Sequence, residues 1–127
     1  MPPLLIVDGA NVVGSVPDGW WRDRHGAAER LRDRLVAYAA DGLPGRPGPC
    51  EVVLVVEGAA RGVQSVPGVR VEAAGGSGDD RIVELVDAAD QPCVVVTADR
   101  ELRRRVSALG AETVGPRTVR GGPGDRA

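Results

Sequence analysis

Three short, uninterrupted apolar runs organise the chain, at residues 4–7, 52–56 and 93–96. Each run is rich in β-branched residues, which is typical of strands that are buried on both faces of a parallel sheet. Weaker apolar segments at 69–71 and 112–114 predict two further strands. The pattern therefore predicts a sheet whose strands come from segments along almost the whole chain.

Between these runs, apolar residues recur at helical spacing in segments 27–39, 79–89 and 100–109. The third stripe ends at Gly110, a residue suited to the position that follows a helix. Alternating strands and helices favour a three-layer α/β/α architecture with right-handed crossovers between parallel strands. We therefore predict a single-domain α/β fold with a mostly parallel sheet.

The chain of 127 residues is long enough for one domain with a core and too short for two ordinary domains. Hydrophobic residues make up 43% and charged residues 27%, which is a globular rather than a disordered composition. We predict that the domain covers residues 1–120. The Pro- and Gly-rich segment 42–50 is expected to be a loop, and residues 121–127 a disordered tail with nothing to bury.

Composition excludes several classes of function. All 16 basic residues are arginine, which excludes the lysine-dependent chemistry of P-loop ATPases, Schiff-base enzymes and receiver domains. The chain has no Phe, one Tyr and two Trp, which rules out an aromatic-rich binding surface. Because no run of about 18 apolar residues occurs, we expect a soluble, cytoplasmic protein without a membrane partner.

Cysteine and histidine show no catalytic or metal-binding pattern. Cys50 and Cys93 lack metal-ligand spacing and are expected to be reduced and buried. His25 is the single histidine, which argues against a histidine-based zinc site and a Ser-His-Asp triad, and we expect it at the surface. The net charge of −2 argues against a chain that binds nucleic acid over its whole surface.

Each of the three strong apolar runs is followed closely by an acidic residue. Asp8 and Glu57 directly follow the first two runs, and Asp99 follows the third after two residues. The pair Asp79 and Asp80 follows a glycine-rich segment and begins the second predicted helix. Because parallel strands end at the same edge of a sheet, where open α/β sheets bind ligands, we expect these side chains to converge.

Converging carboxylates repel one another, and a divalent cation removes the repulsion. Mg²⁺ and Mn²⁺ prefer oxygen ligands and commonly bind carboxylates together with a substrate phosphate, and two such ions can promote phosphodiester hydrolysis. Asp79, Asp80 and Asp99 also suit helix N-termini, and Glu57 suits the exit from a strand. Asp8 has no obvious structural need, so the metal hypothesis depends on the acids meeting at one edge.

Three segments in order carry a resemblance to a known family. Residues 5–13 read LIVDGANVV, and residues 77–82 read SGDDRI, with an aspartate at a helix start and isoleucine three residues later. Residues 94–102 read VVVTADREL, a strand that ends in Thr, one residue and then Asp. Together they resemble the motifs of the NYN/YacP-like branch of the PIN-like ribonucleases, over residues 4–115.

The resemblance implies a PIN-like fold and a ribonuclease that depends on Mg²⁺ or Mn²⁺ and has RNA as its partner. By their positions in the family motifs, the resemblance implies that the metal ligands and catalytic residues are Asp8, Asp79 and Asp99. It implies a further catalytic residue, Asn11, and two supporting residues, Thr97 and Ser77. Asp80, beside the second-motif aspartate, is a further candidate metal ligand.

Two positions depart from the family pattern, and neither removes a core aspartate. YacP-like chains often have an aspartate before the glycine that follows the second strand, whereas this chain has Glu57 before Gly58. Glu57 is therefore a candidate ligand that the family pattern does not itself assign. The alanine that usually precedes the second-motif aspartate is Gly78 here.

Four residues are candidates for RNA contact. Arg100, Arg103 and Arg104 lie on or beside the third predicted helix, where they can bind phosphates or form a solvated face that pairs with Glu101. Trp20, in the loop after the first strand, can stack on an unpaired base or pack over the first helix.

Alternative functions stay open at this point. One is an RNA-binding module of the same fold with weak or lost catalysis, against which the three retained aspartates argue. A Toprim-like enzyme would use Glu57 but needs a later Asp-x-Asp pair, which is absent. A haloacid-dehalogenase-like phosphatase needs an aspartate where Ala10 stands, and a lysine. A homodimer and a protein partner that supplies RNA specificity are further expectations.

Overall fold

The structure, a computed structural model, describes residues 2–120, so the predicted tail at 121–127 lies outside the described residues. The strands of the main sheet are β1 (Leu4–Asp8), β4 (Glu51–Val56), β5 (Val69–Ala73), β6 (Cys93–Val96) and β7 (Glu112–Val114). The α-helices are α1 (Gly9–Gly14), α2 (Arg24–Asp41), α3 (Gly78–Ala88), α4 (Arg100–Ser107) and α5 (Arg117–Arg120). The short elements are the 3-10 turns η1 (Trp20–Arg22) and η2 (Gly58–Ala60), and the hairpin strands β2 (Gly42–Leu43) and β3 (Arg46–Pro47).

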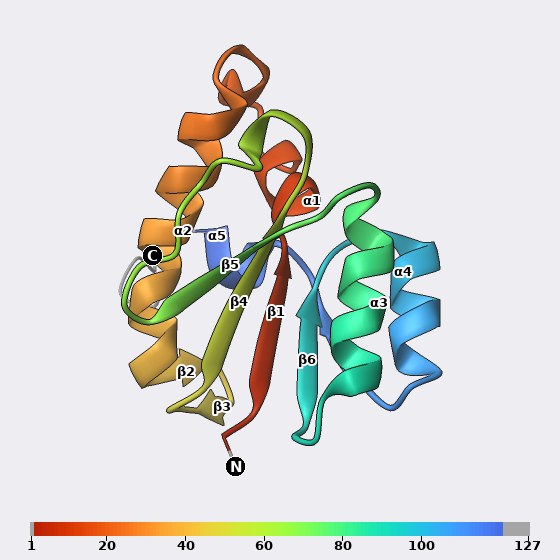
Figure 1. The fold of residues 1–127 in the computed structure, drawn as a ribbon. Coiled ribbons are helices and arrows are strands. Elements are labelled where there is room, and N and C mark those ends of the chain that lie inside the picture. The colour runs from red at the N-terminus through yellow and green to blue at the C-terminus, as the bar shows by residue number, and fades with distance from the viewer. Residues whose placement is uncertain (1, 121–127) are drawn as a thin grey trace.

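The main sheet has the strand order β5–β4–β1–β6–β7, and every neighbouring pair is parallel. β1 is central, since Leu5 pairs with Val52 of β4 on one side and with Val94 of β6 on the other. The chain builds β4 and β5 on one side of β1 and then crosses to the other side for β6 and β7 (Figure 1). The predicted parallel α/β sheet is confirmed, and the strand order reverses beside β1, where such sheets bind ligands.

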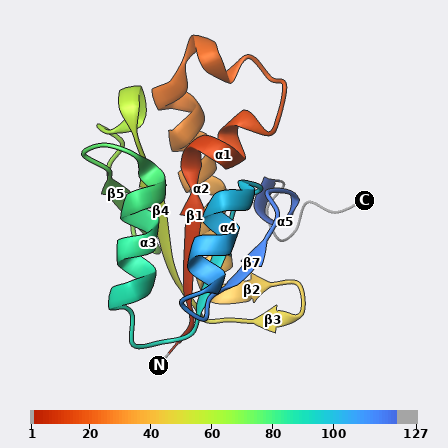
Figure 2. The ribbon, with the colours of Figure 1, turned by 90° about the vertical axis from the view of Figure 1, so that its right-hand side faces the viewer.

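Helices cover both faces of the sheet and give the predicted three layers. Alternate residues of β1 point to opposite faces, so Leu5 packs with Leu31 of α2, while Ile6 packs with Ile82 of α3 and Leu102 of α4. Figures 1 and 2 show α2 and α5 on one face and the pair α3 and α4 on the other. Burial of each such side chain contributes about 1.5–3 kcal/mol. Within residues 2–120, no helix is both long and apolar enough to cross a membrane.

Several short elements differ from the sequence prediction. α1 follows β1 without a break, and its six residues are too few to show a helical period. Segment 42–50, predicted as a loop, contains the antiparallel pair β2 and β3, which Gly45 connects at a φ of 75°. The loop predicted for Trp20 forms the 3-10 turn η1. These elements depend on turn and capping geometry rather than on hydrophobic periodicity.

The cysteines and the histidine match the predictions in part. Both cysteines are free, and Cys93 is buried, but Cys50 is only half-buried because it lies in the turn that leads into β4. The Cys50 thiol donates a hydrogen bond to the Tyr38 carbonyl at 3.2 Å. His25 was expected at the surface and is half-buried, with Nδ1 3.5 Å from a carboxylate oxygen of Glu29.

Gly9, the first residue of α1, allows this helix to lie close to β4. A Cβ atom at Gly9 would lie 2.6 Å from the Val55 carbonyl oxygen, so we expect Gly9→Ala to lower the free energy of unfolding by about 1–3 kcal/mol. Gly14→Ala, at the other end of the same helix, is the matched control, since its Cβ would lie 3.7 Å from the Trp20 ring. Urea denaturation measures both. Equal stability of the two variants would contradict the close packing at Gly9.

Candidate active site

The acidic residues meet at the carboxyl end of the sheet, beside the central strand. An open pocket of about 360 Å³ lies there. Its lining consists of Asp8, Ala10, Asn11, Glu57, Ser77, Asp79 and Asp99. These residues come from the ends of β1 and β4, from α1, and from the starts of α3 and α4. The predicted convergence of the carboxylates at one edge is therefore present in the fold.

Asp8 is held in place by residues from two other parts of the site. It is the last residue of β1, only 6% exposed, and its side chain also caps α1 by accepting the Asn11 N–H at 3.4 Å. The other carboxylate oxygen accepts the Thr97 hydroxyl at 2.9 Å. The Asn11 side-chain oxygen accepts the Ala98 N–H at 2.8 Å. These contacts fasten β1 and α1 to the segment that follows β6.

Thr97 links Asp8 to Asp99. Its hydroxyl donates to Asp8 and accepts the Asp99 N–H at 3.1 Å. Asp99 also caps α4, with one oxygen accepting the Leu102 N–H at 3.0 Å. Asp99 thus has the structural role of a helix N-cap and also lines the pocket, so the two interpretations of this residue are compatible.

Glu57 joins the end of β4 to the start of α3. One of its carboxylate oxygens accepts the Gly78 N–H, and a Cβ atom at Gly78 would lie only 2.6 Å from that oxygen. Ser77 caps the same helix, since its hydroxyl accepts the Asp79 N–H at 3.1 Å. The two departures from the family pattern, Glu57 and Gly78, are therefore in direct contact.

Burial and mutual repulsion raise the pKa of two of the carboxyl groups. Burial is the main reason that the pKa of Asp8 rises from 3.8 to about 6; hydrogen bonds from Thr97 and Asn11 oppose the rise, and the charges of Asp79 and Glu57 add to it. Burial also raises the pKa of Asp79, with further increases from Asp99 and Glu57. The carboxylates of the pocket thus lie close enough to disfavour one another's ionisation.

Asp80, the further candidate ligand, faces away from this pocket. Its carboxylate accepts a hydrogen bond from Arg105 of α4 at 3.0 Å, and it does not line the pocket. Arg105 also lowers the pKa of Asp79, against the carboxylates that raise it. This pair could not be predicted from the sequence, because residues 25 positions apart become neighbours only when α3 packs against α4.

The donors of the pocket suit a hard divalent cation, which prefers carboxylate oxygens. No group of three or more His, Cys, Asp or Glu side chains in residues 2–120 is arranged to hold a metal ion by itself. Mg²⁺ is commonly bound through one or two carboxylates with several waters and a substrate phosphate. Asp8, Asp79 and Asp99 fit that mode of binding as residues of one open pocket.

The candidate RNA contacts have different surroundings. Arg103 is half-buried, and its Nε donates to the Thr97 carbonyl at 2.8 Å, so it supports the loop that carries Asp99. Arg104 is exposed and pairs with Glu101, as in the solvated-face alternative. Arg100 is exposed beside Asp99. A role in RNA binding stays a prediction for each of these arginines.

Comparisons with known proteins identify the fold. No protein-family model matches the chain, and no curated protein matches its sequence. The structure of Rae1 (YacP) from Bacillus subtilis superposes with a TM-score of 0.73 at 20% identity, covering 91% of this chain and 70% of Rae1. A mutant of Rae1 gives a TM-score of 0.71 at 22% identity, covering 94% and 72%. The chain has the fold of Rae1 (YacP). At this level of identity, the likeness concerns the fold.

Asp8 is expected to lower the stability of the metal-free protein at neutral pH. Because its pKa is raised to about 6 in the folded chain, the loss of free energy of unfolding caused by the ionised Asp8 is absent below pH 3.8 and complete above about pH 6. Asp8→Asn removes the charge and should raise the free energy of unfolding by up to about 3 kcal/mol at pH 7 in EDTA.

Urea denaturation from pH 4 to pH 8 tests this expectation, because the gain should grow as the pH rises. Asp87→Asn, on an exposed part of α3, is the control and should change stability by less than about 0.5 kcal/mol. A gain that is the same at pH 4 and pH 8 would show that the charge of Asp8 is not its cause.

The contact between Glu57 and Gly78 predicts a coupled pair of substitutions. Gly78→Ala should lower the free energy of unfolding by about 1–3 kcal/mol, since the new Cβ displaces the Glu57 carboxylate. Adding Glu57→Asp shortens the acidic side chain and should restore about 1 kcal/mol or more of this loss. Gly75→Ala is the control, because nothing lies within 4 Å of its new Cβ. Additive effects of the two substitutions would disprove the coupling.

Proposed function

We propose that this protein is a metal-dependent ribonuclease that hydrolyses RNA phosphodiester bonds at the carboxylate pocket, with Mg²⁺ or Mn²⁺ as its cofactor. The observation that carries the proposal is the convergence of Asp8, Glu57, Asp79 and Asp99 from four segments on one open pocket. Burial and mutual repulsion raise the pKa of Asp8 and Asp79, so gathering these charges in one pocket is unfavourable unless a cation compensates them.

The fold and the motifs support the same proposal. The fold is that of Rae1 (YacP), and the three motifs of the chain resemble those of the YacP-like branch of the PIN-like ribonucleases. The aspartates of these motifs, Asp8, Asp79 and Asp99, are residues of the pocket. Fold, motifs and pocket thus point to one location for the chemistry.

The residues of the pocket divide into those that bind a cation and those that position them. Asp8 and Asp99 would provide carboxylate oxygens, and the Thr97 hydroxyl sets their relative placement through its bonds to both residues. Asp79 has no hydrogen bond to its carboxylate among the described residues, so its oxygens are available to a cation. The Asn11 oxygen is held by Ala98, which leaves its NH₂ group to donate to a phosphate oxygen.

Hydrolysis joins a water oxygen to phosphorus and breaks the bond from phosphorus to one ribose oxygen, which leaves with a proton. A bound divalent cation supplies a more acidic water and neutralises charge on the phosphate. The carboxylates of the chain hold the charge of the cation at the end of the sheet, and Asn11 orients the phosphate beside it. The open form of the pocket gives a long polymer access to these groups.

We expect RNA cleavage that needs Mg²⁺ or Mn²⁺, stops with EDTA, and falls by about a hundredfold or more in Asp79→Asn and Asp99→Asn. Cleavage of an end-labelled structured RNA measures this, with Asp87→Asn as the matched control on the exposed part of α3. DNA of the same sequence tests the preference for RNA.

The outcomes of this assay separate the alternatives. Equal cleavage by the wild type and both pocket variants would mean that the pocket is not the active site. RNA binding without cleavage under any metal condition would favour the binding module of the same fold.

A further inference from the structure

A second, smaller pocket adjoins the carboxylate pocket. It has a volume of about 190 Å³ and lies between α1, η1, α2 and η2. Its apolar walls are Val13, Trp20, Ala28, Val56 and Ala60. Ala10 and Glu57 line both pockets, so the apolar pocket opens directly beside the proposed site of hydrolysis.

Trp20 gives this pocket a fixed aromatic wall. The guanidinium of Arg24, the first residue of α2, lies over the Trp20 ring, 5.5 Å from the centre of the ring. On the side of α1, the Trp20 ring faces Gly14. A Cβ atom added at Gly14 would lie 3.7 Å from the ring, which is an ordinary van der Waals distance. Trp21 stands edge-on to Trp20, is 53% exposed and does not line the pocket. The ring is thus ordered before any ligand arrives.

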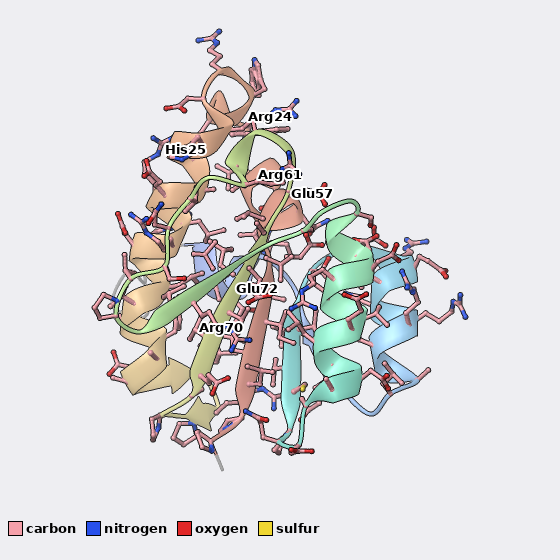
Figure 3. All side chains as sticks on the ribbon, in the orientation of Figure 1. Arg24, His25, Glu57, Arg61, Arg70 and Glu72 are labelled. Carbon is pink, nitrogen blue, oxygen red and sulfur yellow. The ribbon has the colours of Figure 1, made fainter. Side chains whose placement is uncertain are left out.

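Two cations lie at the same end of the molecule as the mouth of the pocket. Arg24 and Arg61 are both exposed, and neither forms an ion pair with a carboxylate within residues 2–120. Arg24 lines the pocket together with Glu57, and Figure 3 shows Arg61 near Glu57 with Arg24 above them, at the same end of the molecule. Apolar walls, one aromatic face and arginines without an ion pair form the combination by which proteins bind single-stranded nucleic acid, since bases stack and phosphates pair with the cations.

We propose that the apolar pocket binds the base of an unpaired nucleotide next to the phosphate that is hydrolysed. The inference rests on the proposed function, because it is the shared wall of Ala10 and Glu57 that sets the base beside that phosphate. The volume of about 190 Å³ is below the roughly 300 Å³ at which pockets for drug-sized ligands begin, which suits one ring system and no more.

The proposal defines the class of substrate. A base can enter the pocket only when it is unstacked and unpaired, as in single strands, loops and bulges. Paired regions of RNA are therefore cleaved slowly, and sites of cleavage lie where one base is free to leave the stack. Trp20 serves as a binding residue in this proposal, and the carboxylates carry out the chemistry.

Trp20→Leu and Trp21→Leu form a matched pair of variants for cleavage of a single-stranded RNA. Trp20→Leu should raise KM about tenfold with little change in kcat, because the stacking of one base is lost. Trp20→Phe should recover most of the affinity, and Trp21→Leu should cleave like the wild type. RNA that lacks the base on one side of the cleaved bond should be a poor substrate for the wild type. Trp20→Leu should cleave this RNA no more poorly than the wild type does.

A binding measurement tests the pocket without altering Trp20 and without catalysis. In Trp21→Leu, Trp20 is the one remaining tryptophan, and its fluorescence can be titrated in EDTA. A short single-stranded RNA should quench it saturably, a free nucleoside monophosphate should do so more weakly, and ribose 5-phosphate should have no effect. Stronger quenching by the monophosphate than by the RNA would overturn the proposal in favour of a free nucleotide site.

The two proposals can fail separately. Metal-dependent cleavage that is equal in Trp20→Leu and Trp21→Leu, and equal for RNA with and without the base, overturns the base pocket and leaves the nuclease intact. Absence of cleavage in the wild type overturns the proposed function. The fluorescence titration then shows whether the apolar pocket binds a base. Absence of both cleavage and quenching overturns both proposals.

Discussion

The Asp8 carboxylate ends the central strand of the sheet and is almost completely buried, so its charge depends on partners that other segments provide. Thr97, which directly follows β6, donates its hydroxyl to Asp8 and accepts the N–H of Asp99. Asn11 adds a second connection through Ala98. The ends of two neighbouring strands and the starts of two helices are fixed relative to one another by these few bonds, and the pocket takes its form from them.

The sequence predicts the main features of the fold because hydrophobic runs report burial directly. Segments 4–7, 52–56 and 93–96 are strands of a parallel sheet, and both 69–71 and 112–114 lie within strands. Since every strand of the main sheet is parallel to its neighbours, the acids that follow the runs had to come to one edge. The same rule places Asp8 and Asp99 at one edge without knowledge of the strand order, and the adjacency of β1 and β6 then brings them close together.

What the sequence could not provide depends on contacts between distant segments. Nothing in the sequence near Asp80 indicates its bond to Arg105, which arises from the packing of two helices. The contact of Glu57 with Gly78 is hidden for the same reason, although both positions are visible as departures from a family pattern. The longer acidic side chain occupies the space that an alanine methyl would fill, so the two departures compensate for one another. The short α1 and α5 lack enough residues for any periodic signal.

The position of β1 has a consequence for the way in which the chain is made. Its partners on the two sides, β4 and β6, are synthesised long after it, so the first strand to leave the ribosome is paired on both sides only after residue 96 has been made. Any product that ends before residue 97 lacks both Thr97 and Asp99 and leaves Asp8 without its hydroxyl donor. The full set of carboxylates at this edge of the sheet therefore exists only in chains that extend past Asp99, and Asp99 acquires its capping bond only when α4 follows it.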